Sequence, residues 1–173
     1  MGQTPPLIRP AEPGDELAVA KVHVRSWQVA YRGLFSSSYL DALKPEDRAR
    51  RYSFGSSDPR APATLVALMD AAICGFATTS PARDADSQGK GELAGLYVDP
   101  DWWDSGVGRA LIVAARERLA QRGFAAATLW VLDSNARAMR FYAKDGWKPD
   151  GMRRVEKVWD VKVQEVRYSR PLP

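Results

Sequence analysis

The sequence predicts a mixed α/β fold in which a sheet of about seven strands is flanked by about four helices. Two observations support this class. Short apolar runs bounded by turn residues alternate with longer segments whose apolar residues recur at helical spacing. The chain has 173 residues, of which 45% are hydrophobic, so it can bury one sizeable core and is too short for two domains of typical size. We therefore expect residues 1–173 to form a single domain.

The first third of the chain predicts one strand followed by helices. Residues 7–9 are apolar enough for a short strand, and the helical pattern that follows covers 15–31, with Asp15 as its N-cap. Residues 37–43 and the segment after Pro45 predict two further short helices.

The middle of the chain predicts a hairpin, a loop and a central strand. Residues 63–69 and 72–80 are apolar or β-branched runs separated by 70–71, which is typical of an antiparallel hairpin. Residues 81–91 are polar and predict a mobile loop that could act as a lid. The run 93–98 is short and apolar, as in a strand that is buried on both faces.

The last third of the chain predicts a strand, a helix and a closing hairpin. Gly123 is a C-terminal stop for the preceding helix, and 126–132 has the composition of a buried strand. Cap residues introduce a helix over 135–144. Two alternating runs, 147–158 and 161–169, predict the hairpin.

A glycine-containing loop joins the central strand to the next helix. Pro100 stops the strand, and from Val107 the apolar residues recur at helical spacing, so the helix begins at Gly106 and Gly108. The first N–H groups of a helix have no partner inside it, and the peptide dipoles place partial positive charge there. Glycine lets a bulky anion approach these groups. The loop therefore predicts a phosphate site. It lacks the Gly-Lys-Ser/Thr ending of the Walker loop and the three-glycine fingerprint of dinucleotide-binding folds.

Two motifs resemble segments of the GCN5-related N-acetyltransferase superfamily. Residues 103–108, Trp-Asp-Ser-Gly-Val-Gly, are similar to the Gln/Arg-x-x-Gly-x-Gly/Ala loop of that family, with Trp103 in place of Gln or Arg and Asp104 in place of Gly or a basic residue. Residues 135–147 resemble the Asn-x-x-Ala-x-x-Phe-Tyr-x-x-x-Gly-Phe segment, with Trp147 for the usual Phe. Two motifs in the right order are more specific than either alone.

The resemblance extends to segments 26–34 and 165–172 and so covers nearly the whole chain. It implies a mostly antiparallel sheet with the order β-α-α-β-β-β-α-β-α-β-β, and acetyl-coenzyme A as the acetyl donor. By the resemblance, the following residues would contact the coenzyme: Leu96, Tyr97, Val98, Trp103, Asp104, Ser105, Gly106, Val107, Gly108, Arg109, Asn135 and Tyr142.

Acetyl transfer from a thioester to an amine needs a neutral amine, a donor for the developing oxyanion and a proton for the departing thiolate. The resemblance makes a backbone N–H of 96–98 the oxyanion donor and Tyr142 the acid; the alternative is a core tyrosine. The resemblance also makes Glu92 the candidate base. The alternatives are that Glu92 is a solvated carboxylate, that a base acts through water, or that no base beyond the solvent is used. Asn135 can cap its helix, bind the coenzyme, or do both.

Aromatic residues recur every four positions through Trp27, Tyr31, Phe35 and Tyr39. We interpret Trp27 as part of a helix face packed into the core. The functional interpretation makes Tyr31, Phe35 and Tyr39 the wall of an acceptor pocket. Because Gly33 interrupts the helix, we expect the later aromatic residues on a loop, where binding residues are common. The four are the candidate residues of the acceptor site. The acceptor is expected to be an amine of a small molecule or of a peptide.

The composition argues against several other classes. The formal net charge is +4, but Lys and Arg are interspersed with Asp and Glu, so no basic stripe for nucleic acid is formed. His23 and Cys74 are the only residues of their kinds, which leaves no metal-ligand cluster and no internal disulfide. The sequence has neither a signal segment nor an apolar run of membrane-spanning length, so we expect a cytoplasmic protein with no membrane partner.

We conclude that the sequence favours an N-acetyltransferase that uses acetyl-coenzyme A and no metal. Three other functions stay open: a non-catalytic acyl-coenzyme A sensor, a nucleotide-binding enzyme and a nucleic-acid-binding domain. Edge strands of the closing hairpin could pair between subunits, which would allow a homodimer.

Overall fold

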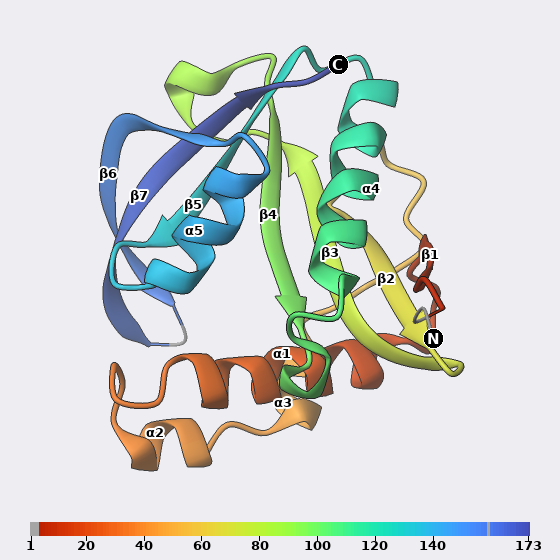
Figure 1. Cartoon of the computed structure of the whole chain (residues 1–173), viewed down its shortest axis with the longest axis vertical. Coiled ribbons are helices and arrows are strands. Elements are labelled where there is room, and N and C mark those ends of the chain that lie inside the picture. The colour runs from red at the N-terminus through yellow and green to blue at the C-terminus, as the bar shows by residue number, and fades with distance from the viewer. Residues whose placement is uncertain (1–3, 159) are drawn as a thin grey trace. The chain divides into compact units, whose positions relative to one another are not determined.

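The computed structural model describes residues 4–158 and 160–173. Across these residues, seven strands form one sheet in the hydrogen-bonded order β1-β2-β3-β4-β5-β7-β6 (Figure 1). The strands are β1 (Leu7–Pro10), β2 (Ala63–Met69), β3 (Ala72–Pro81), β4 (Gly91–Val98), β5 (Ala126–Leu132), β6 (Lys148–Val158) and β7 (Val161–Pro171). β4 and β5 pair in parallel, whereas the pairs β1–β2, β2–β3, β5–β7 and β6–β7 are antiparallel. The predicted mixed, mostly antiparallel sheet is confirmed.

Five α-helices accompany the sheet in the described ranges, against about four expected. They are α1 (Glu16–Ala30), α2 (Ser37–Asp41), α3 (Pro45–Ala49), α4 (Val107–Gln121) and α5 (Ala136–Lys144). The two short helices predicted over 37–43 and after Pro45 are both present as α2 and α3, whereas the order given by the resemblance counts a single helix between α1 and β2. Ser36 caps α2 by accepting a hydrogen bond from the Tyr39 N–H, and Pro45 occupies the first turn of α3, where its missing N–H is not needed.

Contacts within the chain divide it into two compact units. The first comprises the described residues up to Thr79 together with Gly95–Ala115, and the second comprises Ser80–Ala94 and Arg116–Pro173. β4 and α4 each contribute residues to both units.

The core of the first unit forms between α1 and the β2–β3 hairpin. Val19 and Val22, one helical turn apart, are buried with Val66 of β2 and Phe76 of β3. Gly75 of β3 allows close packing on α4, because a Cβ there would lie 2.9 Å from Leu111 Cδ1. The hydrophobic stripe of α1 is thus buried against the hairpin, as the helical spacing predicts.

The start of α1 differs from the expectation in one respect. Asp15 occupies the N-cap position, but its side chain does not cap the helix. It accepts hydrogen bonds from Arg9 Nη1 of β1 at 2.7 Å and from the Glu12 N–H at 2.8 Å. The hydrogen bond from Arg9 holds the pKa of Asp15 below its ordinary value. The expected side-chain cap is wrong because an arginine on the neighbouring strand binds the carboxylate.

The predicted hairpin of β2 and β3 is confirmed, and its two-residue turn explains the register. Asp70 and Ala71 both have positive φ, at 49° and 65°. Two left-handed residues are the signature of a type I′ turn, whose twist matches that of the flanking strands. Met69 accordingly pairs with Ala72 at the start of the antiparallel ladder.

The second unit is built on β5, β6, β7 and α5. Leu129 is buried and pairs with Tyr168 of β7, while β6 is exposed along most of its length and pairs only with β7 in the described sheet. Asp145, the residue after α5, accepts hydrogen bonds from Arg116 Nε at 2.9 Å and from Trp147 Nε1 at 3.0 Å. These contacts fix the C-terminal end of α5.

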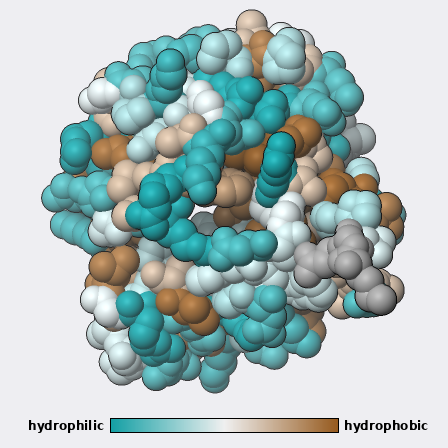
Figure 2. Space-filling model, viewed as in Figure 1, coloured by the Kyte–Doolittle hydropathy of each residue, from teal (hydrophilic) through white to brown (hydrophobic). Residues whose placement is uncertain are grey.

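The surface is consistent with this burial. Hydrophilic residues cover most of the face shown in Figure 2, and hydrophobic residues form small separate patches on it. Within 4–158 and 160–173, no helix is both long enough and apolar enough to cross a membrane.

Candidate functional site

The loop between β4 and α4 in the first unit has the local structure that its glycines predict. Gly106 has a φ of +90°, which favours glycine, and nothing lies within 4 Å of the position of a Cβ. Its carbonyl accepts the first helical hydrogen bond, from Ala110 N–H at 3.0 Å. The N–H groups of Val107, Gly108 and Arg109 therefore have no partner inside α4. Such a helix N-terminus can accept an anion, and this one lies at the end of the loop that follows β4.

The two residues that depart from the family motif have separate local roles. The Trp103 indole N–H donates to the Val98 carbonyl at 2.8 Å, so this side chain ties the loop back to β4. Asp104 is exposed and has a φ of 59°, a left-handed conformation that aspartate tolerates better than most residues. Ser105 donates its hydroxyl to the Trp102 carbonyl. The loop is therefore held in shape by its own side chains.

Residues 96–98 of β4 supply both a core side chain and the backbone that the resemblance assigns to coenzyme binding. The Tyr97 ring packs into the first unit, with its centroid 4.2 Å from the His23 ring and 5.3 Å from the Phe76 ring. The register of β4 with β5 consists of Gly91 with Ala127 and Glu92 with Thr128. Residues 96–98 lie beyond that ladder, and it is their backbone that the resemblance assigns to the coenzyme.

The four aromatic candidates lie together in the first unit. The Trp27 ring is 4.4 Å from that of Tyr31 and stacks on that of Phe35 at 5.7 Å, and Phe35 meets Tyr39 at 6.2 Å. Trp27 is buried, as interpreted, but so is Tyr31. Tyr39 lies in α2, in agreement with the helix predicted over 37–43 and not on the loop expected after Gly33; the cap from Ser36 gives that segment a helical turn. Phe35 and Tyr39 are half-buried.

A buried histidine lies beside these residues in the first unit. His23 Nδ1 is hydrogen-bonded to the Tyr52 hydroxyl and accepts from Arg48 Nε at 3.2 Å. Burial, with a smaller effect of the Arg48 charge, holds the pKa of His23 well below its ordinary value. His23 is therefore a neutral core residue.

Glu92, the candidate base, lies in the second unit at the start of β4. It is 3% exposed, so its interpretation as a solvated carboxylate is wrong. Oε2 accepts from the backbone N–H of Arg83 at 3.4 Å and Oε1 accepts from Arg83 Nη2 at 3.3 Å. Thr128, its register partner, is fully buried, and Oγ1 has no hydrogen-bond partner among the described residues. Paired residues project to one face of a sheet, so Glu92 and Thr128 share a polar face.

The remaining two candidates belong to α5 in the second unit. Asn135 Oδ1 accepts from the Ala138 N–H at 3.0 Å, which confirms that Asn135 caps this helix. Tyr142 is buried, and its ring makes edge contacts with the rings of Phe141 at 5.4 Å and Trp147 at 6.4 Å. The Tyr142 ring is therefore packed in the core, as the alternative interpretation predicts. Its hydroxyl remains the candidate acid.

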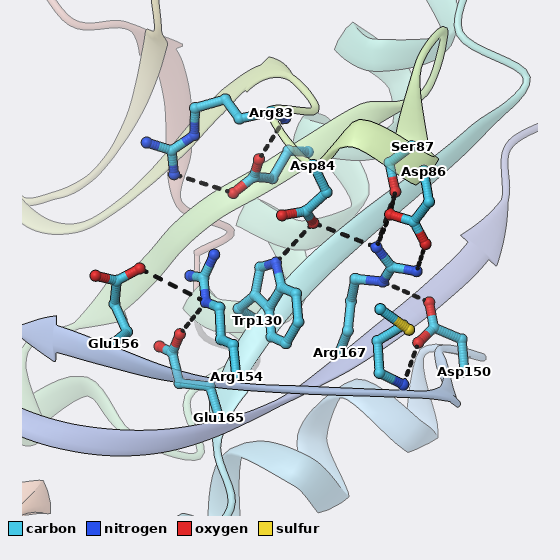
Figure 3. A network of polar contacts seen from close by, with 12 residues as sticks. Arg83, Asp84, Asp86, Ser87, Trp130, Asp150, Arg154, Glu156, Glu165 and Arg167 are labelled. Carbon is cyan, nitrogen blue, oxygen red and sulfur yellow. Dashed lines mark hydrogen bonds and ion pairs between the residues drawn. The ribbon is translucent and has the colours of Figure 1, made fainter.

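A cluster that sequence reasoning missed surrounds Arg167 of β7 (Figure 3). The Arg167 side chain is 4% exposed, and its guanidinium donates to Asp86 at 2.7 Å from both Nη1 and Nη2 and to Asp150 from Nε at 2.7 Å. Nη1 also donates to Ser87 at 3.0 Å and to Asp84 at 3.3 Å. We call these five residues the Arg167 clamp. The Arg167 hydrogen bond is the main reason that the pKa of Asp86 falls to about 2.

The clamp changes the interpretation of the segment predicted to be a mobile lid. Asp84, Asp86 and Ser87 all belong to that segment, residues 85–87 form a 3-10 turn, and Ser87 is fully buried. The segment is therefore anchored to β7. A usable signal was present in β7: Glu165 and Arg167 continue the alternation that passes through Val163, so both fall at buried positions of the strand. Despite these carboxylates, no group of three potential ligands in the described chain is arranged to hold a metal ion.

The mixed sheet and the strand–loop–helix unit define an α/β protein that offers a helix N-terminus to an anionic ligand. The chain belongs to the acetyltransferase (GNAT) family, whose model matches residues 24–147. It is accordingly an acyltransferase of the N-acetyltransferase class.

Three similar proteins illustrate the relationship. An uncharacterized N-acetyltransferase of Bacillus subtilis, YuaI, is 30% identical over 135 residues, which are 74% of this chain and 72% of that protein. The spermidine N(1)-acetyltransferase of Thermoplasma acidophilum is 24% identical over 145 residues, 82% of this chain and 87% of that protein. The crystal structure of the PaiA N-acetyltransferase of Thermoplasma acidophilum in complex with coenzyme A has a TM-score of 0.71 at 22% identity, covering 97% of this chain and 99% of that one, and shows the same fold.

Proposed function

We propose that this chain transfers an acetyl group from acetyl-coenzyme A directly to the amine of a small molecule. The observation that carries the proposal is the N-terminus of α4 at Gly106, at the end of the loop that follows β4, in a member of the GNAT family. The complex of the PaiA N-acetyltransferase with coenzyme A supports the choice of donor.

The N–H groups of Val107, Gly108 and Arg109 are proposed to bind the pyrophosphate of the coenzyme. Three donors at one helix terminus match the oxygens of a phosphate, and the helix dipole adds attraction. Asp104 is exposed, so the solvent screens its charge. The backbone of residues 96–98 is proposed to pair with the pantetheine arm, since it lies beyond the ladder of β4 with β5.

The chemistry is proposed to use one acid and one base. The amine nitrogen forms a bond to the thioester carbonyl carbon, and the carbon–sulfur bond breaks as the oxyanion collapses. Tyr142 gives its hydroxyl proton to the departing thiolate, and Glu92 takes the proton that the amine nitrogen loses, directly or through a water molecule. A backbone N–H of residues 96–98 stabilises the oxyanion. The burial of Glu92 and its placement on β4 support its role.

A small-molecule amine is the proposed acceptor, and a peptide amine is the alternative. The relative named as a spermidine acetyltransferase supports the small amine. Phe35 and Tyr39, the half-buried members of the aromatic group, are proposed to contact the apolar part of the acceptor. We further propose that a second copy pairs along β6, the exposed edge strand, and light scattering would give the mass of the assembly.

The test combines binding with turnover. Calorimetry with acetyl-coenzyme A, ATP and NAD should show binding of the first alone, and a screen of amines for thiol release should identify the acceptor. Tyr142→Phe should lower turnover well over tenfold with little change in coenzyme affinity. Tyr168→Phe, which alters a second buried tyrosine of the same unit, is the matched control and should keep full turnover.

Two results would contradict the proposal. Unaltered turnover of Tyr142→Phe would refute the acid assignment. Coenzyme binding without thiol release for any amine would favour a sensor over an enzyme.

A further inference from the structure

We propose that Arg167 is a positioning residue for the acetyl transfer: through Asp84 it fixes Arg83, which holds the carboxylate of Glu92. The effect on catalysis rests on the proposed function, because it takes Glu92 to be the base. The effect on the loop conformation does not depend on the proposed function. The effect on catalysis and the effect on the loop can be measured separately.

The first step is the anchoring of the loop by Arg167. All three nitrogens of the guanidinium donate to carboxylates, and these come from the loop and from β6 (Figure 3). The bidentate contact with Asp86 sets the direction of the loop as well as its distance, since two parallel hydrogen bonds define an orientation. Without Arg167, the carboxylates of Asp84, Asp86 and Asp150 would lose the guanidinium that they share, and like charges at short range repel.

The second step links the clamp to Arg83. Asp84 Oδ2 accepts from Arg167 Nη1 at 3.3 Å and from Trp130 Nε1 at 2.9 Å, so its side chain is held from two strands. Arg83 directly precedes Asp84 in the chain. The base of the loop is closed by the Ala82 N–H, which donates to the Lys90 carbonyl at 2.9 Å. The backbone at Arg83 is therefore fixed on one side by the hydrogen bond of Ala82 and on the other by the contacts of the Asp84 side chain.

The third step is the hold of Arg83 on Glu92. The backbone N–H of Arg83 donates to Oε2 and its Nη2 donates to Oε1. The Arg83 side chain is 73% exposed, so water competes for it and the backbone contact is the more dependable one. That contact has the right direction only while the loop keeps its clamped conformation. Arg167 thus orients a carboxylate that it does not touch.

Limited trypsin digestion tests the loop directly, because Arg83 and Lys90 are cleavage sites within it. Arg167→Met should increase cleavage after these two residues at least tenfold, as measured by mass spectrometry. Asp84→Ala keeps Arg167 and should also speed cleavage after Lys90, the bond whose flanking residues the substitution leaves unchanged, which covers the case in which Arg167→Met fails to fold. Arg9→Met removes a bidentate Arg–Asp pair in the first unit and is the matched control, with cleavage at the wild-type rate. Wild-type cleavage in both clamp variants would overturn the proposal.

Kinetics test the effect on catalysis. Arg167→Met and Asp84→Ala should each lower kcat at least tenfold and leave the KM for acetyl-coenzyme A within twofold. Arg167→Lys, which keeps the charge without the fork, should recover part of kcat. A purely structural role would lower the melting temperature without this division between kcat and KM.

The two measurements separate the possible failures. If Glu92→Gln leaves kcat unchanged, the base assignment in the proposed function is wrong, and trypsin still decides whether the clamp holds the loop. If Glu92→Gln lowers kcat and the clamp variants release the loop without lowering kcat, the link from Arg167 to Glu92 is refuted.

Discussion

Replacing His23 with glutamine tests the burial of the chain's one histidine through the pH dependence of stability. The imidazole is 5% exposed, and its pKa lies well below the ordinary value because burial disfavours the charged form. In the unfolded chain it titrates near 6.5. Below that pH the unfolded state binds one more proton than the folded state, so the free energy of unfolding falls as the pH falls.

The magnitude follows from this difference of one proton. While the folded imidazole stays neutral, the loss relative to high pH reaches about 1.4 kcal/mol at pH 5.5, and its slope approaches about 1.4 kcal/mol per pH unit. Urea unfolding at pH 7.5 and 5.5 measures it. The wild-type protein should lose most of this amount between the two values, and His23→Gln should lose little, since carboxylates titrate mainly below this range.

Tyr52→Phe is the matched control, because it removes a hydrogen-bond partner of His23 and keeps the histidine. It should be less stable than the wild type and retain the pH dependence. If His23→Gln and the wild type lose stability in parallel, the titration of His23 does not cause the loss and the reasoning is wrong.

Two further substitutions test packing, and urea unfolding measures both. Gly75→Ala places a Cβ 2.9 Å from Leu111 Cδ1 and 3.1 Å from the Tyr97 carbonyl, so it should cost about 1–3 kcal/mol through overpacking; unchanged stability would show that α4 yields at no cost. Thr128→Val removes a buried hydroxyl without a partner among the described residues and should stabilise the fold by about 1 kcal/mol; a loss of stability would show that the hydroxyl binds a group such as water.

The elements that sequence reasoning predicted are those with local signals. Pro100 and Gly106 mark the ends of the loop between β4 and α4, and both elements lie where these residues place them. The cap of α5 by Asn135 is likewise a contact between residues three apart. Such signals reflect backbone geometry that a few neighbouring residues determine, so the order of the elements along the chain and the glycine loop were accessible without coordinates.

The contacts that the sequence did not reveal are those between distant segments. Arg167 binds Asp86 across 81 positions, and no periodicity encodes that pairing. The polar composition of the segment around Asp86 therefore predicted mobility, whereas the charges are used for anchoring. Asp15 is a similar case. An aspartate at the start of a helix predicts a side-chain cap, but its carboxylate accepts a hydrogen bond from Arg9 of β1 instead.

The exposed edge formed by β6 has a consequence for how copies of this protein meet. Six of the eleven residues of β6, in the sequence KPDGMRRVEKV, are charged, and both signs occur. An approaching strand must present the opposite charge to each charged residue of β6, because like charges directly opposite one another are destabilising. The edge can accept a strand of complementary charge order while it resists indiscriminate stacking. High salt, by screening those charges, should weaken this selectivity and make the protein more prone to aggregate.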